Sequence, residues 1–421
     1  MSSPSRPPSY IAVLRTPQAC RVFGAALLGR LSYGTVFLSL VLALTSATGS
    51  YAVAGGAMAL FGLTSSLLSP LRADLIDRYG PRRALPPMAV LYALLLVCLA
   101  AATWQPGASG ALLATLAVAA GACTPPLGPV MRTLWSDLLA DRQLLQRAYS
   151  LDTVAEELLF VTGPLLAGLL AALAKPAAGV ALSALLVLIG TFALVSSPVV
   201  RAAQTLRAGT VSAGMPHPGP DTDPASSRWR QMYGMGGLIH PVVVSVGVGM
   251  CLGALSLLMV VFAGRHHQGA AVAWVEAALS VGSAVGGLAY GAVSWRVSGQ
   301  VRLSALAAAL GLTLAAAGFS PNLYVLAAVA GVAGLFVAPA LTTAYLLADE
   351  SAAPQNRTRA GAWVNTAFNI GASSGTAAIG LLVGNLPLAL CFVVAAAPAL
   401  LSAVMALGRQ RRSATVPALN R

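Results

Sequence analysis

The chain has 421 residues, of which 57% are hydrophobic and 9% charged, and its net charge is +13. A water-soluble domain carries roughly 25% charged residues, so a globule of this composition could not cover its own apolar surface in water. The arginines recur in short clusters between apolar runs, which excludes the continuous basic face of a nucleic-acid-binding protein and predicts a chain that lies mostly in lipid.

Twelve apolar runs are long enough to cross a bilayer, for which roughly 20 residues are needed. The first run shows no cleavage pattern of a signal peptide, so we expect it to stay attached as the first helix. The predicted cores are residues 22–44, 52–71, 85–104, 110–131, 151–173, 178–199, 238–263, 269–294, 303–319, 322–347, 361–384 and 387–408.

These runs predict an all-α membrane protein with an amino-terminal bundle of six helices (1–200) and a carboxyl-terminal bundle of six (237–408). Between them, residues 201–236 are rich in Ser, Pro and Gly and cannot bury enough apolar surface to fold alone. We predict a largely disordered cytoplasmic linker there and a cytoplasmic tail at 409–421.

Ionisable side chains inside a bilayer cost several kcal/mol or are neutralised, so each one is a functional candidate. Arg30 lies within the first predicted helix, and Glu156 and Glu157 lie within the fifth. Counted at about 1.5 Å per residue from the same side, their depths are similar. We therefore expect Arg30 to pair with one of the two glutamates, either as a structural ion pair or as part of energy coupling.

The loop between the second and third predicted helices reads Ala73-Asp-Leu-Ile-Asp-Arg-Tyr-Gly-Pro-Arg-Arg83. It resembles the signature loop of major facilitator transporters, Gly-x-x-x-Asp-Arg-x-Gly-x-Arg-Arg, with Ala73 in place of the leading glycine. The resemblance implies a cytoplasmic latch that steadies one conformation and breaks during transport. Its residues would be Asp77, Arg78, Gly80, Arg82 and Arg83. The alternative, plain retention of positive charge on the cytoplasmic side, requires neither the aspartate nor the glycine.

Prolines mark the fourth and tenth predicted helices. Pro125, Pro126 and Pro129 lie in the fourth helix and Pro339 lies in the tenth, which predicts interrupted helices beside a cavity. Drug/proton antiporters of the family usually carry an arginine within the fourth helix. Here the corresponding candidate, Arg132, lies at the inner end of the predicted run.

The fifth predicted helix contains Gly163-Pro-Leu-Leu-Ala-Gly168. This segment resembles the antiporter motif of the same family, Gly-Pro-x-x-Gly-Gly, which is associated with exporters. The motif residues here are Gly163, Pro164 and Gly168, whereas Ala167 and Leu159 replace two of the family's glycines. A packing kink without directional meaning is the alternative interpretation.

Basic residues are retained on the cytoplasmic side of a membrane during insertion. All but three of the 25 Lys and Arg residues lie in the two terminal segments, the even-numbered loops or the linker; the exceptions are Arg30, Lys175 and Arg265. This asymmetry predicts a multi-pass protein of the cell membrane with both termini in the cytoplasm.

An internal repeat relates the two halves. Arg147 and Ala148 recur as Arg359 and Ala360, and Gly163 and Gly168 recur at the same displacement as Gly375 and Gly380. Because the repeat is six helices long, both copies keep the same orientation in the membrane, as in parallel repeats related by a pseudo-two-fold axis.

Small residues form helix-contact faces in the eighth predicted helix, at Gly282, Gly286 and Gly287, and in the eleventh, at Gly371 and Gly375. The family resemblance implies that the fifth helix meets the eighth, and the second the eleventh, across the two halves. Sliding at these faces would then permit the halves to rock.

A carboxyl group in apolar surroundings resists ionisation, so it can bind and release a proton near neutral pH. Glu276, in the eighth helix, and one of Glu156 and Glu157 are therefore the predicted proton carriers. Further cavity residues are predicted by depth and helix: Tyr33, Cys123, Thr124, Met250, Phe336, Asn365 and Asn369.

The sequence contains no nucleotide-binding loop, metal-spaced His/Cys set or nucleophile elbow, so we predict neither an enzyme nor a cofactor or metal site. The chain is similar to actinobacterial drug/proton antiporters, which implies export of a small amphipathic or drug-like compound in exchange for protons by alternating access. The alternatives are a proton-coupled importer of a small metabolite and a non-transporting receptor or scaffold. Expected partners are a small-molecule substrate, protons and the lipid bilayer, without nucleic acid, and we expect a monomer.

Overall fold

The computed structural model describes residues 9–201, 236–266 and 272–414, and within these ranges the regular elements are helices, without a strand. The amino-terminal half contains α1 (Tyr10–Arg15), α2 (Ala19–Thr48), α3 (Tyr51–Leu67), α4 (Ser69–Tyr79), α5 (Pro81–Ala102), α6 (Gly110–Cys123), α7 (Leu127–Leu138), α8 (Arg142–Leu173) and α9 (Pro176–Val195). The carboxyl-terminal half contains η1 (Gly236–Leu238), α12 (Ile239–Arg265), α13 (Val272–Ala292), α14 (Gly299–Ala317), α15 (Leu323–Ser351), η3 (Pro354–Asn356), α16 (Arg357–Leu382) and α17 (Leu388–Ala414). Apart from its two end residues, the predicted linker lies outside the described residues, and α17 extends into the predicted tail.

Ten helices of the described chain are long and apolar enough to cross a membrane, and α3 with α4 makes an eleventh span if the bent pair is counted as one. The remaining predicted span is α16, which has 26 residues, begins with a polar segment and packs along α12. All twelve predicted runs fall on helices, and the fold class predicted from the sequence is confirmed.

The prolines predicted to interrupt two helices act differently. Thr124, Pro125 and Pro126 separate α6 from α7, because successive prolines remove two backbone donors and disfavour helical geometry in the residues before them. Helix α15, by contrast, runs through Pro339 without a break, so this part of the prediction is wrong. A single proline removes only one backbone hydrogen bond, and a long packed helix tolerates that loss.

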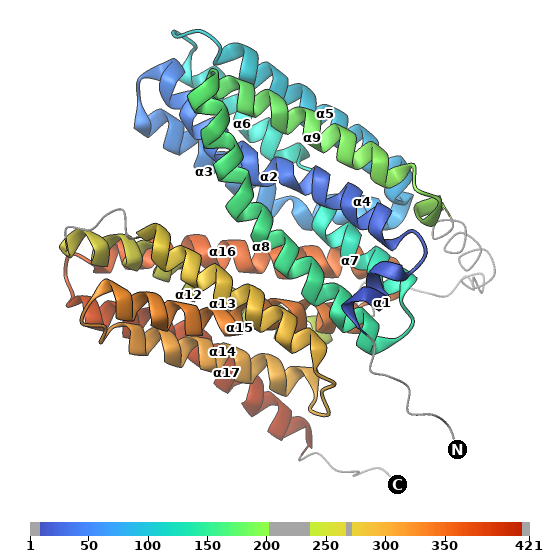
Figure 1. Ribbon diagram of the computed structural model, residues 1–421, viewed down its shortest axis with the longest axis vertical. Coiled ribbons are helices and arrows are strands. Elements are labelled where there is room, and N and C mark those ends of the chain that lie inside the picture. The colour runs from blue at the N-terminus through green and yellow to red at the C-terminus, as the bar shows by residue number, and fades with distance from the viewer. Residues whose placement is uncertain (1–8, 202–235, 267–271, 415–421) are drawn as a thin grey trace, which may run out of the picture.

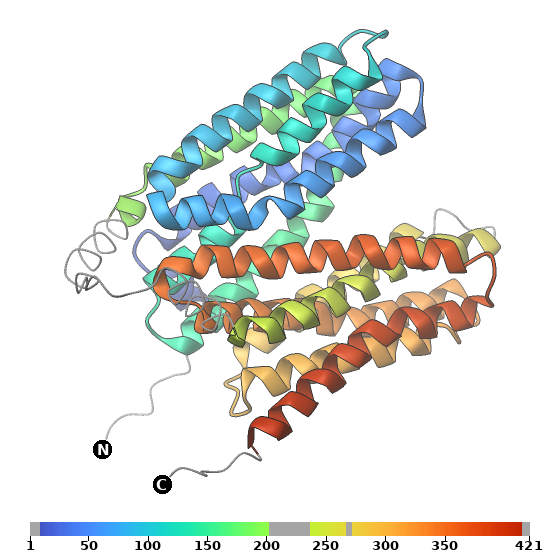
Figure 2. The same cartoon turned by 180° about the vertical axis from the view of Figure 1, so that it is seen from behind.

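The two bundles converge at one end. Figures 1 and 2 show the amino-terminal bundle (blue to green) and the carboxyl-terminal bundle (yellow to red) approaching each other near α1 and α7 and diverging at the opposite end. Between the bundles, α8 contacts α13 and α15, while α16 contacts α4 and α7. These pairs include the contacts between fifth and eighth, and second and eleventh, spans that the family resemblance implies.

Helix α2 lies in the middle of the amino-terminal bundle because small residues let its neighbours approach closely. A methyl group added to Gly163 of α8 would overlap the backbone of Gly34, and one added to Gly190 of α9 would overlap that of Gly29. In lipid, such close packing replaces the hydrophobic effect as the main force between helices. The Gly163 motif is therefore, first of all, the contact between α8 and α2.

Glycines of the carboxyl-terminal bundle also pack mainly within their own bundle. Gly282 and Gly286 face the backbone of α15, and Gly371 and Gly375 face the backbone of α12. The expectation that these faces slide between the halves is wrong for these four residues, because each is already occupied by a helix of the same bundle. Gly287, in contrast, does face α8 across the two halves.

Replacing Gly163 by alanine tests the contact between α2 and α8. We expect Gly163→Ala to lower the free energy of unfolding by about 1–3 kcal/mol, the usual cost of overpacking, because the added methyl overlaps Gly34. Gly168→Ala is the matched control, since nothing lies within 4 Å of its added methyl. Thermal unfolding in detergent should show a lower midpoint for the first variant only. Equal midpoints would contradict the packing role.

Candidate functional site

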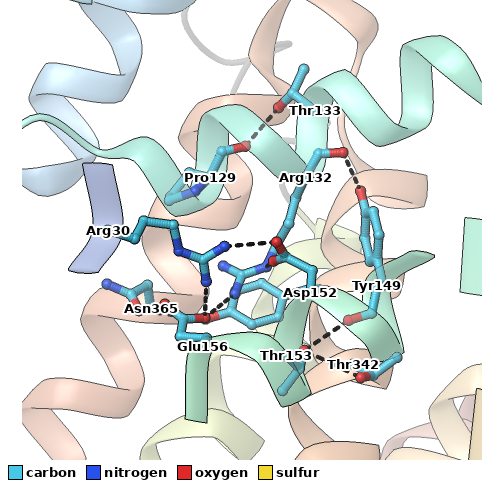
Figure 3. Close-up of polar contacts among 11 residues, drawn as sticks. Arg30, Pro129, Arg132, Thr133, Tyr149, Asp152, Thr153, Glu156, Thr342 and Asn365 are labelled. Atoms are coloured by element: carbon cyan, nitrogen blue, oxygen red, sulfur yellow. Dashed lines mark hydrogen bonds and ion pairs between the residues drawn. The ribbon is translucent and has the colours of Figure 1, made fainter. Parts of the chain in front are cut away.

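A cluster of four buried charges lies inside the amino-terminal bundle, formed by Arg30 of α2, Arg132 of α7, and Asp152 and Glu156 of α8. Arg30 contacts Asp152 at 2.7 Å and Glu156 at 2.8 Å. Arg132 contacts Asp152 at 3.1 Å and also pairs with Glu156. Figure 3 shows the two guanidinium groups between the two carboxylates.

The charge cluster is balanced and largely closed to its surroundings. Arg30, Arg132 and Asp152 are 2%, 3% and 0% exposed, whereas the Glu156 side chain is 25% exposed. A buried charge is tolerated only when it is paired, and here each acid faces both bases. Glu156 is therefore the most accessible member of the charge cluster.

Local structure explains why these side chains meet. Asp152 and Glu156 are four residues apart on α8 and so project from the same helix face. The break at Thr124–Pro126 ends α6 and starts α7, which carries Arg132 into the bundle. The hydroxyl of Tyr149 donates to the carbonyl of Arg132 at 3.0 Å and fixes α7 against α8.

Contacts from the carboxyl-terminal bundle reach the charge cluster. The guanidinium of Arg132 lies 3.6 Å from the ring centroid of Tyr345 on α15, a cation–π contact between the two bundles. The Tyr345 hydroxyl donates to Asn365 of α16 at 3.4 Å, and Thr342 donates to Thr153 at 3.3 Å. Figure 3 shows Asn365 beside Glu156.

The structure brings Arg30 and Glu156 together, in keeping with their similar predicted depths. Sequence reasoning did not select Asp152, and it placed Arg132 at the end of a helix instead of within the bundle. A spacing of four residues between Asp152 and Glu156 was the available signal for the missing acid. The position of Arg132 depends on the helix break, whose direction a sequence does not give.

Glu157 does not belong to the charge cluster, so of the two glutamates that could pair with Arg30, only Glu156 does. Because it follows Glu156 directly, its side chain leaves α8 in a different direction, toward α13. There the hydroxyl of Ser283 donates to its Oε1 at 2.5 Å, and Ser283 in turn accepts from the backbone N–H of Ala338 on α15 at 3.1 Å. The Oε2 of Glu157 is buried and has no hydrogen-bond partner among the described residues.

Glu276, the other predicted proton carrier, is exposed near the start of α13 and makes no ion pair within the described ranges. Its role stays a prediction. The structure thus separates three acidic positions that the sequence grouped together: Glu156 is paired with arginines, Glu157 lies between the bundles, and Glu276 is exposed.

The predicted cavity residues fall into three groups. Asn365 lies beside the charge cluster, and Met250, Phe336 and Asn369 are partly buried on α12, α15 and α16. The hydroxyl of Tyr33 donates to the carbonyl of Pro125, and Thr124 ends α6, so both support the break between α6 and α7. Cys123 lines a separate pocket of the amino-terminal bundle.

Asp77 joins the two bundles at their converging end. Its carboxylate accepts from the backbone N–H groups of Thr358 at 3.3 Å and Arg359 at 2.9 Å, in the first turn of α16. The first N–H groups of a helix lack partners within it, and a negative charge there is favourable. Asp74 adds a contact to the Arg359 guanidinium at 3.4 Å. We call this group of contacts the α16 latch.

The other residues of the signature loop do not reach α16. Gly80 has a φ of 81°, a left-handed conformation that glycine adopts readily, and it turns the chain from α4 into α5. Arg78 pairs with Asp74 at 2.7 Å on its own helix. Arg82 and Arg83 are exposed and make no ion pair among the described residues.

Donors from the amino-terminal bundle hold the end of α13, in what we call the α13 latch. Gln146 donates to the carbonyls of Tyr290 and Val293 at 3.0 Å, and Arg147 donates to that of Ala292 at 3.0 Å. The last carbonyls of a helix lack partners within it, and a positive charge there is favourable. Arg147 and Arg359, which are equivalent in the internal repeat, thus serve the two latches.

Two more contacts join the bundles at the same end. Tyr10 of α1 donates to the carbonyl of Leu288 on α13 at 2.5 Å, and Arg142 pairs with Glu350 at 2.5 Å. Within the described residues, no group of three or more His, Cys, Asp or Glu side chains is arranged to hold a metal ion. The chemistry of the site is therefore that of paired charges, hydroxyls and amides.

Removing one charge from the charge cluster should destabilise the protein. Asp152→Asn leaves Arg30 and Arg132 with a single acid, and the usual cost of an unpaired buried charge is about 3–5 kcal/mol. The double variant Arg30→Gln/Asp152→Asn restores the charge balance and should recover part of this loss in thermal unfolding. Glu350→Gln, which removes an exposed pair, should cost about 1 kcal/mol or less. Equal midpoints for Asp152→Asn and Glu350→Gln would refute the role of the charge cluster.

Loss of the α16 latch should loosen the converging end. Spin labels at Tyr79 and Val297, which are 58% and 51% exposed, report the separation of the two bundles there. In a cysteine-free background, Asp77→Ala should add a population with a longer distance, because two N–H groups of α16 lose their acceptor. Arg82→Gln should leave the distances unchanged. An unaltered distribution in Asp77→Ala would argue against a latch.

Comparison with known proteins places this arrangement among membrane proteins. A family model described as the Major Facilitator Superfamily matches residues 22–302 and 266–420. No curated protein sequence matches the chain.

Solved structures of similar architecture cover almost the whole chain. A bacterial homologue of the iron transporter ferroportin, in its outward-facing state, matches with a TM-score of 0.69 and 16% identity, over 93% of this chain and 99% of that one. The proton:xylose symporter XylE matches with a TM-score of 0.68 and 13% identity, over 92% and 95%. The human organic anion transporter MFSD10 matches with a TM-score of 0.67 and 16% identity, over 92% and 98%. At such low identity, the likeness establishes the fold.

Proposed function

The chain belongs to the major facilitator superfamily and is a multi-pass membrane transporter, and from that premise we propose that it exports a small amphipathic organic compound in exchange for protons. Export proceeds by alternating access, in which the two bundles open in turn to either side of the cell membrane. The observation that carries the proton coupling is the environment of Glu157.

Glu157 is the acid best suited to carry the proton. It lies at the contact between α8 and α13, accepts one hydrogen bond from Ser283, and has its second oxygen buried without a partner. No basic side chain of the described residues forms an ion pair with it. A carboxyl group without a basic partner can be neutral without leaving a charge unpaired, whereas Asp152 and Glu156 each pair with two arginines.

The position of Glu157 also supports a coupling role. The Ser283 hydroxyl belongs to α13 and is itself held by α15, so the hydrogen bond to Glu157 spans the two bundles. Rearrangement of the bundles changes that bond and the access of water to the carboxyl group. A proton taken up in one conformation can then be released in the other.

The direction of transport rests on the antiporter-like segment Gly163–Gly168 and on the apolar character of the predicted cavity helices. The cavity candidates include the apolar side chains Met250 and Phe336, with Asn365 and Asn369 as the amides. A largely apolar wall with few hydrogen-bonding groups favours an amphipathic solute over a sugar-like metabolite. The proton-coupled importer is the second candidate, and the fold allows either direction.

The latches support alternating access over a static receptor or scaffold. At the converging end the bundles are joined by hydrogen bonds to helix ends, by side-chain amides and by exposed ion pairs. Hydrogen bonds to water can replace such contacts at a small net cost in free energy, whereas separating an apolar interface would expose apolar side chains to water. With both termini at the cytoplasmic face, as the basic residues predict, this converging end is the cytoplasmic one and the bundles diverge toward the outer side.

Vesicles with an imposed pH difference distinguish the candidates. About one pH unit supplies about 1.4 kcal/mol per proton, enough for roughly tenfold accumulation. An antiporter concentrates its solute in the acidic compartment and a symporter in the alkaline one, whichever way the protein is inserted. We expect accumulation on the acidic side for at least one lipophilic cation or antibiotic of a panel including tetraphenylphosphonium and ethidium.

Glu157→Gln should abolish this accumulation and leave counterflow exchange of the solute intact. Glutamine keeps the size and the contact with Ser283 but cannot release a proton. Glu276→Gln is the comparison, because Glu276 is also a predicted carrier but lies exposed on α13. Intact proton-driven accumulation in Glu157→Gln, or loss of accumulation only in Glu276→Gln, would show that the proton is bound elsewhere.

A further inference from the structure

A second pocket lies on the amino-terminal bundle, apart from the space between the halves. Its volume is about 560 Å³, and it is formed by α4, α5 and the end of α6. The wall is mostly apolar, with Leu75, Met88 and Leu91 among its residues, and two arginines, Arg72 and Arg83, complete it. Neither the charge cluster nor the two latches contribute to this pocket.

Arg72 is a buried charge without a counter-ion. It is 6% exposed, and no Asp or Glu among the described residues forms an ion pair with it. Its guanidinium instead donates to three backbone carbonyls, those of Gly121 at 2.6 Å, Ala122 at 2.8 Å and Ser65 at 2.5 Å. Its Nε is buried and has no hydrogen-bond partner among the residues that the structure describes.

The carbonyl contacts explain why Arg72 is there but not how its charge is balanced. They satisfy backbone groups at the two helix breaks, between α3 and α4 and after α6, which lipid could not satisfy. Carbonyl groups are dipoles and carry no net charge. The three carbonyl contacts thus satisfy much of the hydrogen bonding of the guanidinium, but no Asp or Glu of the described residues balances its positive charge.

Arg83 adds a second positive group at the edge of the same pocket. It is exposed and makes no ion pair in the described part of the chain, and it does not join the α16 latch. Next to it, Tyr79 and Leu91 are 58% and 47% exposed on the outer surface of the bundle. The pocket is therefore accessible from the outer surface of the bundle.

We propose that this pocket binds a single-chain amphiphilic anion, such as a long-chain carboxylate, with its acidic head at the arginines and its chain along the apolar wall. The buried positive charge of Arg72, which no acid of the described residues balances, favours an anion, and the wall of Leu75, Met88 and Leu91 favours an apolar chain. A pocket of about 560 Å³ matches the size of a site for one small ligand. This site is independent of the transported solute proposed above.

Photolabelling of the full chain tests the proposal. The protein is reconstituted in neutral phosphatidylcholine nanodiscs and exposed to a palmitic acid that carries a diazirine, and labelled peptides are mapped. We expect labelling in α4, α5 and the end of α6, competed by oleate but not by methyl oleate, which has the same chain without the charge. Equal competition by the ester would overturn the proposal, because the pocket would then be an apolar crevice without a preference for anions.

Variants locate the anion at the arginines. Arg83→Gln should weaken competition by oleate about threefold to fivefold, as expected for one partly exposed charge pair, and Arg82→Gln should not. Met88→Trp should reduce labelling by filling the pocket while leaving both arginines in place. Arg72 also supports two helix breaks, so Arg72→Met could weaken binding by destabilising the fold. Its labelling is therefore compared only together with its thermal unfolding midpoint. Arg83→Gln is the main test of anion binding.

Two outcomes contradict the proposal. Equal effects of Arg83→Gln and Arg82→Gln would show that the pocket does not recognise the charge. If phosphatidylglycerol displaced the probe at a lower concentration than oleate, the preferred ligand of the pocket would be a membrane phospholipid and not a single-chain acid. Failure of proton-driven transport in the vesicle experiment would affect neither result, since the labelling needs no transport.

Discussion

A charge inside a lipid-embedded bundle has to find its partner within the protein, and much of this structure follows from that constraint. Arg30 and Arg132 share Asp152 and Glu156, and the shared pairing ties α2, α7 and α8 together. Four ion pairs in a low-dielectric interior act as a unit, because removal of any one charge leaves another uncompensated. The cluster is thus a rigid element of the amino-terminal bundle, and the partly exposed Glu156 is the face it turns to the second bundle.

The same constraint acts differently at Arg72 and at Glu157. Arg72 is paired only with carbonyl dipoles, so its positive charge remains available to an anion from outside the protein. Glu157 can lose its charge by taking up a proton, and it needs no basic partner. Mutual pairing is thus one solution to this problem, and we propose an external counter-ion for Arg72 and neutralisation for Glu157 as two others. Each gives the group concerned a different chemical use.

At their converging end, the two bundles are held together by contacts to the ends of helices. At the α16 latch a carboxylate meets N–H groups at the start of a helix, and at the α13 latch an amide and a guanidinium meet carbonyls at the end of one. Both arrangements are favourable for the helix dipole, and in both the helix-end groups could form hydrogen bonds with water in place of the latch residues. Within each bundle, by contrast, glycines such as Gly34 and Gly163 bring backbones into direct contact. Each bundle is therefore closely packed within itself, whereas the contacts at helix ends that join the two bundles can be replaced by hydrogen bonds to water.

The sequence by itself determined that the chain lies mostly in lipid, that it has an all-α membrane fold, and which residues are candidates for functional sites. Local and periodic features can be recognised in a sequence without a structure. Here they are the apolar runs of bilayer length, the repeat that relates Arg147 to Arg359, and the charged loop around Asp77. Depth along a helix can also be counted, which is why the proximity of Arg30 and Glu156 was predictable. Only the tertiary structure showed which way each helix runs after a break and which neighbouring helix each side chain faces. The break at Pro126 carries Arg132 inward, adjacent glutamates point to different bundles, and the bundle partners of Gly282 and Gly371 depend on which helix lies opposite. Sequence spacing gives the angle between two side chains on one helix, but which neighbouring helix each side chain meets depends on how the helices pack.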